Sequence, residues 1–87
     1  MHFVDKVQAQ GEKQRKIPVP KKFWVDFPLD SWVKVSLLND ESIFFVDIIQ
    51  EQGKIQRRIP LPQKFWDLFE IGAIIRVDVI HKGGKTK

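Results

Sequence analysis

Two stretches of the chain are nearly the same: "RKIPVPKKFW" occupies residues 15–24, and "RRIPLPQKFW" occupies residues 57–66. The similarity extends beyond both. Shifting the chain by 42 positions aligns residues 3–38 with residues 45–80 without a gap, and sixteen of the thirty-six pairs are identical. Two copies are too few for a stacked solenoid, which needs three or more to bury its faces. We therefore predict that the two repeats bury one shared core and are related by two-fold pseudosymmetry.

Length and composition limit the class of protein. A chain of 87 residues predicts a single domain over 1–87, because two independent cores do not fit in so short a chain. The absence of cysteine excludes disulfides and thiolate metal sites. No apolar run is long enough for a bilayer span, and the first ten residues lack the layout of a secretory signal. These features predict a cytoplasmic protein with no membrane partner.

Each repeat reads as strand, turn, strand, short helix and strand. Gly11 and Gly53 lie where the first two strands reverse direction, a place that favours positive φ. Pro20 and Pro62 suit the first turn of a helix. Spacings of four place two phenylalanine pairs on helical faces: Phe23 with Phe27, and Phe65 with Phe69. We expect an all-β chain of six strands and two short helices, joined between the repeats at residues 39–44.

The second repeat carries a family resemblance. A Gly-containing turn followed by "QRRIPLPQKFWDLFEIGAIIRVDV", residues 56–79, resembles the AbrB-like family, whose ββαβ units end in a Gly-Asp box before the last strand. That box is degraded here: Ala73 follows Gly72, and Asp30 and Ser31 stand at the matching places. With both units in one chain, the sequence is most similar to small archaeal cradle-loop proteins of RIFT topology. This resemblance implies a closed six-stranded barrel, in which the second repeat pairs the strand edges that one repeat leaves open.

Positive charge is concentrated at matching places of the two repeats. Residues 8–22 and 50–64 hold nine basic and two acidic side chains, a net charge of plus seven; the tail 81–87 adds plus three, and the rest sums to minus six. Such local basicity is typical of a protein that binds the phosphate backbone of nucleic acid. In AbrB-like regulators, arginines of this region contact DNA. The predicted nucleic-acid-binding residues are Lys13, Arg15, Lys16, Lys54, Arg57 and Arg58.

A structural role for part of this charge is an open alternative. If the hairpin turns centre near positions 10 and 52, Asp5 lies opposite Arg15 and Asp47 lies opposite Arg57, which would form cross-strand ion pairs. Surface lysine and arginine can also be no more than solvated charges. The tail 81–87 is most simply a flexible basic end. A monomer is feasible because both repeats share one chain, and a homo-oligomer is also open.

The chain shows no catalytic signature. His2 and His81 do not match between the repeats, and no other ligands accompany them, so no metal site, catalytic residue or cofactor is expected. The aromatic residues of the repeated motif are expected to pack in the core rather than to stack on bases. Trp32 has no aromatic counterpart, because Ile74 stands at the matching place.

These observations favour a noncatalytic module that binds nucleic acid through its basic loops. Two alternatives come from other classes of protein. One is a barrel that binds a small anionic ligand, such as a nucleotide or flavin phosphate. The other is a protein-interaction barrel, which an exposed Trp32 beside an apolar patch would favour.

Overall fold

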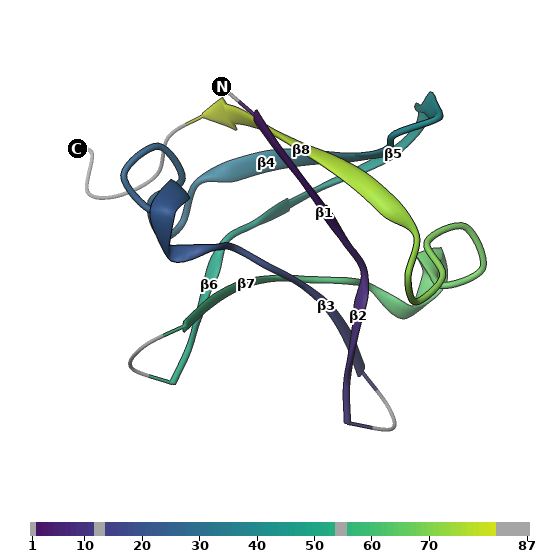
Figure 1. Ribbon diagram of the computed structural model, residues 1–87, viewed down its shortest axis with the longest axis horizontal. Coiled ribbons are helices and arrows are strands. Elements are labelled where there is room, and N and C mark those ends of the chain that lie inside the picture. Colours follow the sequence, from purple (N-terminus) through teal and green to yellow (C-terminus); the bar gives the residue numbers. More distant parts are fainter. Residues whose placement is uncertain (1, 12–13, 54–55, 82–87) are drawn as a thin grey trace.

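The computed structural model describes residues 2–11, 14–53 and 56–81. The strands and two short 3-10 turns, η1 and η2, follow the chain in Figure 1 as β1 (His2–Lys6), β2 (Gln8–Gln10), β3 (Gln14–Pro18), η1 (Lys21–Phe23), β4 (Trp32–Leu37), β5 (Asp40–Ile48), β6 (Gln50–Gln52), β7 (Gln56–Pro60), η2 (Gln63–Phe65) and β8 (Ile74–His81). The expected all-β character is confirmed.

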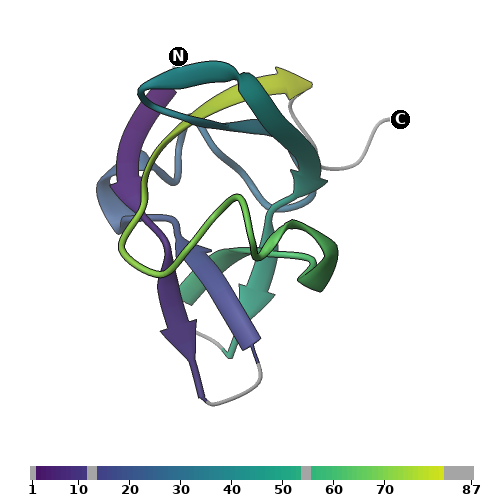
Figure 2. The same ribbon diagram turned by 90° about the vertical axis from the view of Figure 1, so that its right-hand side faces the viewer.

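The strands form two antiparallel four-stranded sheets. One has the order β1-β8-β4-β5, and the other has the order β2-β3-β7-β6. The first sheet lies across the top of Figure 1, and the β2–β3 and β6–β7 hairpins extend below it on the same side of the molecule (Figures 1 and 2). The two basic stretches of the sequence therefore belong to one sheet. No described helix is long and apolar enough to cross a membrane.

The predicted closed barrel of six strands is wrong. In the described residues the first strand of each repeat is broken, at Val7 and at Ile49, so that β1 and β5 are edges of one sheet while β2 and β6 are edges of the other. At each break the backbone bonds to a loop of the other repeat. The Val7 amide donates to the Ala73 carbonyl at 3.0 Å, and the Ile49 amide donates to the Ser31 carbonyl at 3.1 Å. The second repeat completes the core, but the strand edges do not close on one another.

The pairing of equivalent strands is symmetric. β3 pairs with β7 so that Ile17 faces Ile59, its own counterpart 42 positions later. β4 pairs with β8 in the same way, with Val35 opposite Val77. A local two-fold axis therefore passes through the centre of each pair of strands. Each residue of β3 therefore has an equivalent residue on β7, on the other side of this axis.

The core lies between the two sheets. Parity along the strands decides its membership, because alternate residues of a strand face opposite sides. Ile17 and Ile59 come from one sheet, and Val35 and Val77 from the other; all four are fully buried. The complete set of buried apolar residues is Phe3, Val7, Ile17, Val19, Phe27, Val33, Val35, Phe45, Ile49, Ile59, Leu61, Phe69, Ile75 and Val77.

The two predicted helices are also wrong. Each is a three-residue 3-10 turn followed by one wider turn. In the wider turn of the first repeat, the Phe27 amide donates to the Phe23 carbonyl at 3.0 Å. In the first repeat Pro28 follows at once, and proline disfavours helix at the preceding residue. The expected packing of the phenylalanines is nevertheless confirmed. Phe3 stacks on Phe23 with 5.1 Å between ring centroids and meets Phe27 edge-on at 4.9 Å, and Phe45, Phe65 and Phe69 repeat this arrangement.

The loop before the last strand depends on left-handed backbone in both repeats. Asp30 has φ of 68° and Gly72, at the matching position, has φ of 92°. This conformation lets each loop bond to the broken strand of the other repeat: the Asp30 amide donates to the Ile49 carbonyl at 2.9 Å, and the Gly72 amide to the Val7 carbonyl at 2.8 Å. The two matching positions therefore share one backbone requirement, although their residues differ.

We expect Gly72→Ala to destabilise the protein by about 1–2 kcal/mol, because a Cβ disfavours left-handed backbone by roughly that amount. Apart from the glycine and its two chain neighbours, no heavy atom of the described residues lies within 4 Å of the position that this Cβ would take, so the cost comes from the backbone and not from a clash. Urea unfolding measures it. Glu70→Ala, an exposed change in the same loop, is the control and should shift stability by less than about 0.5 kcal/mol. Equal stability of the two variants would contradict the backbone requirement.

Candidate nucleic-acid interface

Four of the six predicted binding residues lie on neighbouring strands. Arg15 and Lys16 are on β3, and Arg57 and Arg58 are on β7, in the centre of the β2-β3-β7-β6 sheet. The pairing of β3 with β7 brings the two repeats' basic residues together on one sheet. Lys13 and Lys54 lie outside the described residues, and so does the expected basic tail apart from His81.

The predicted ion pairs between these arginines and aspartates are wrong. Ala9, not Asp5, is the strand partner of Arg15, because the hairpin is centred two positions later than assumed. The break at Val7 also sends Asp5 to the other sheet, where it pairs with Ile75. Asp5 Oδ1 instead accepts a 2.7 Å hydrogen bond from the amide of Lys6. Its equivalent on the edge strand β5, Asp47, accepts one of the same length from the amide of Ile48.

Arg15 and Arg57 each stack on a tryptophan of the other repeat. Arg15 Cζ lies 4.5 Å from the centroid of the Trp66 ring, and Nη1 donates to the Trp66 carbonyl at 3.2 Å. Arg57 Cζ lies 4.3 Å from the Trp24 ring, and Nη1 donates to the Trp24 carbonyl at 3.5 Å. A guanidinium over an aromatic face is held by electrostatic attraction to the ring. The two arginines are therefore fixed in position by contacts between the repeats.

The tryptophans are held in turn by their own repeat. Trp24 Nε1 donates to the Val19 carbonyl at 2.9 Å, and Trp66 Nε1 donates to the Leu61 carbonyl at 3.1 Å. Both rings are partly buried and pack on the core. The prediction that the aromatic residues of the repeated motif serve packing is thus confirmed. The tryptophans have a second role that was not predicted: Arg15 and Arg57 stack on their rings.

Two equivalent hollows flank the β3–β7 pair. The first has a volume of about 210 Å³, and its lining includes Arg15, Arg58 and Trp66. The second has a volume of about 260 Å³, and its lining includes Lys16, Arg57 and Trp24, together with Lys21, whose Nζ lies 5.8 Å from the Trp24 ring. We call these the basic hollows. Each combines a cation of one repeat with a cation of the other, so neither repeat could form one alone.

The electrostatics of the basic hollows favour an anion. Five cationic side chains line them, and among the described residues neither lining includes a carboxylate. A surface lined by charges of one sign raises the local concentration of counter-ions, here anions. Lys16 is held in place as well, since its Nζ donates to Gln52 Oε1 at 3.2 Å.

Glutamines surround these cations. Gln8 is the strand partner of Lys16 and Gln50 is the strand partner of Arg58, so each pair shares the outer face of the sheet. Gln14 and Gln56, also of outward parity, line the two hollows. Neutral amides both donate and accept hydrogen bonds. The outer face of the β2-β3-β7-β6 sheet is therefore cationic at its centre and rich in amides around it.

The sequence prediction missed the tryptophans, Lys21 and the glutamines as members of the site. A signal was present for most of them. Gln8, Gln14 and Trp24 are identical to their counterparts in the second repeat. The two glutamines are exposed, so a need to form the core does not explain their identity. Lys21 had no such signal, since Gln63 stands at the matching place.

The described residues contain no group of three or more His, Cys, Asp or Glu side chains that could hold a metal ion. Comparison of the chain with protein-family models, with curated proteins and with solved structures gives no match in any of the three.

We expect Arg57→Ala to lower the free energy of unfolding by about 1–2 kcal/mol, because it removes a cation–π contact and a hydrogen bond between the repeats. Arg57→Lys keeps the charge but loses the planar stack, and should be destabilising by a smaller amount. The measurement is urea denaturation. Lys6→Ala, on an exposed position of β1, is the control. If Arg57→Ala is no less stable than Lys6→Ala, the Arg57–Trp24 stack does not stabilise the fold.

Proposed function

We propose that the protein is a noncatalytic module that binds nucleic acid through its two basic hollows. The observation that carries this proposal is the pair of hollows itself: two equivalent sites with five cations and no lining carboxylate among the described residues. Clustered cations of this kind displace counterions from a phosphate backbone. Glu51 is the strand partner of Arg57, but the linings of the two hollows consist of cations and uncharged residues among the described residues.

The stacked arginines suit phosphate better than bases. A guanidinium has five N–H donors in a fixed plane, so the bond from Arg15 to the Trp66 carbonyl leaves donors for phosphate oxygens. The guanidinium also covers one face of the tryptophan ring, where a base would otherwise stack. The same holds for Arg57 and Trp24. This chemistry favours contacts to the backbone over contacts to unstacked bases.

The size of the molecule limits the length of the bound segment. The principal extents are 36 × 28 × 22 Å, and one turn of duplex is about 34 Å long. One protein molecule therefore covers no more than about one helical turn. Two-fold symmetry of the hollows also matches a duplex, whose antiparallel strands present their phosphates in symmetric pairs.

The sequence resemblance supports the same proposal. In AbrB-like regulators, arginines that follow the Gly-containing turn contact DNA. Arg57 and Arg58 stand at that place here, and both line the basic hollows.

The test is a titration of a labelled 12-base-pair duplex, followed by fluorescence anisotropy at several salt concentrations. We expect binding that weakens steeply with salt. The double variant Lys16→Ala with Arg58→Ala should bind more weakly, and the slope of log K against log salt should fall in magnitude by about two, one for each lost phosphate contact.

The control removes two charges from the other sheet. Lys6→Ala with Lys34→Ala gives the same net charge as the test variant, but both lysines lie on strands of the β1-β8-β4-β5 sheet. It should keep the slope of the parent protein. Absence of binding at low salt, or equal losses in the two double variants, would refute the proposal.

The small-ligand alternative is tested by thermal unfolding with adenosine and flavin monophosphates. Pockets that enclose such ligands usually have volumes of roughly 300–1,000 Å³, whereas the basic hollows measure about 210 and 260 Å³. We therefore expect each compound at millimolar concentration to raise the melting temperature by less than about 1 °C. A larger, saturable rise that Arg58→Ala abolishes would favour the small ligand over nucleic acid.

A further inference from the structure

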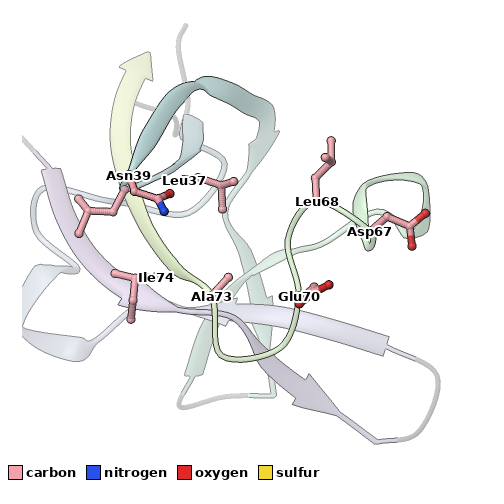
Figure 3. A pocket seen from close by; sticks show the side chains of 8 residues that line it. Leu37, Asn39, Asp67, Leu68, Glu70, Ala73 and Ile74 are labelled. Carbon is pink, nitrogen blue, oxygen red and sulfur yellow. The ribbon is translucent and has the colours of Figure 1, made fainter.

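A third hollow, larger than either basic hollow, shares no lining residue with them. It has a volume of about 520 Å³ and is open to solvent between the β4–β5 connection, the loop after η2 and the first residues of β8. Figure 3 shows Leu37 and Asn39 on one side, and Asp67, Leu68 and Glu70 on the loop opposite. We call it the apolar groove.

Apolar side chains form most of this groove and are exposed to solvent. Leu38 is 46% exposed, Leu68 is 51% exposed and Ile74 is 46% exposed. Single exposed apolar residues are common on protein surfaces, whereas several around one hollow mark an interaction site. Ile71, in the same loop, extends the exposed apolar surface.

Two carboxylates stand on the loop wall of the groove. Asp67 and Glu70 are both exposed, and the Asp67 carboxylate is turned to the outer side of the loop (Figure 3). No cation lines the groove among the described residues, although the chain as a whole carries a net charge of plus four. The groove is thus a locally acidic region of a basic protein. It attracts cations at its rim and apolar groups within.

The internal repeat shows that the fold does not require the two acidic residues of the groove, because Val25 and Pro28 stand at the places that match Asp67 and Glu70. Seven of the eight lining positions have a counterpart in the other repeat, and none of these seven pairs is identical; the eighth, Asn39, belongs to the joint between the repeats. Asp67 corresponds to Val25, and Leu68 to Asp26. In the first basic hollow, by contrast, four of the seven lining residues are identical to their counterparts. Because the same backbone accepts different side chains in the other repeat, the groove's chemistry is free to serve a function that exists once per chain.

We propose that the apolar groove is a docking site for a partner protein, and that it takes a segment with apolar side chains flanked by lysine or arginine. The apolar side chains would lie against Leu38, Leu68 and Ile74, and the cations would lie near Asp67 and Glu70 at the rim. Charge complementarity selects this partner, because Asp67 and Glu70 at the rim repel an acidic segment and attract a basic one. The site is independent of nucleic-acid binding, since it shares no residue with the basic hollows.

Three short peptides test the proposal on the full chain. They are acetyl-Lys-Leu-Leu-Lys-amide, its acidic twin with glutamate for lysine, and a twin with glycine for leucine. Two-dimensional amide NMR reports binding. We expect only the first peptide to shift the amide signals of Leu38, Asn39, Leu68 and Ile74 in a saturable way.

Isosteric variants remove the negative charges of the groove while keeping the shape of the side chains. Asp67→Asn with Glu70→Gln should weaken binding of the first peptide about two- to tenfold, as expected for exposed ion pairs. The control Asp26→Asn with Glu51→Gln has the same net charge, lies outside the groove and should bind as the parent protein does. Leu68→Asn should weaken binding by removing an apolar wall, and the fold accepts a polar residue at the matching position, Asp26.

The outcomes are distinct from those of the duplex titration. Lys16→Ala with Arg58→Ala should bind the first peptide as the parent protein does. If that peptide produces no saturable shifts at the groove, or if the acidic or the glycine twin shifts the same signals equally, the docking site is refuted. The proposal is equally refuted if Asp67→Asn with Glu70→Gln binds the peptide as tightly as the control.

Discussion

The antiparallel pairing of β3 with β7 is the constraint on which the rest of the structure depends. These two strands come from different repeats, and they meet with Ile17 opposite its own equivalent, Ile59. Hydrogen bonds of the backbone continue this pairing past the prolines: the amide of Val19 donates to the carbonyl of Arg57, and the amide of Leu61 donates to that of Arg15. The contact joins the repeats, fixes the local two-fold axis and places both basic stretches on one sheet.

The stacking of arginine on tryptophan follows from this pairing. Because β3 and β7 are neighbours, Arg15 reaches Trp66 and Arg57 reaches Trp24. The guanidinium groups that join the repeats also line the basic hollows. Duplication is therefore more than a way to complete a core. It creates two composite sites that a single repeat does not contain.

The molecule carries two surfaces with different relations to its symmetry. The basic hollows are equivalent, and the residues that form them are largely shared by both repeats. The apolar groove lies between the end of the first repeat and the second repeat, and its lining residues differ from their counterparts. A symmetric ligand such as a duplex suits the first surface, and a single peptide segment suits the second. The two repeats thus share the backbone and most of the residues that line the basic hollows, while the residues that line the apolar groove differ from their counterparts.

Much of the fold and part of the candidate site could be read from the sequence, because they depend on local patterns. Alternation of apolar residues predicts strands and their inward faces, spacings of four predict the phenylalanine contacts, and the repeat predicts that Arg15 and Arg57 have equivalent surroundings. Tertiary structure alone decided the rest. The breaks at Val7 and Ile49 arise from hydrogen bonds to loops of the opposite repeat, and no local pattern encodes such bonds. A shift of two positions in the hairpin register places Ala9 and Glu51, not the expected aspartates, opposite Arg15 and Arg57. Contacts between strands depend on register, which the sequence of one strand does not specify.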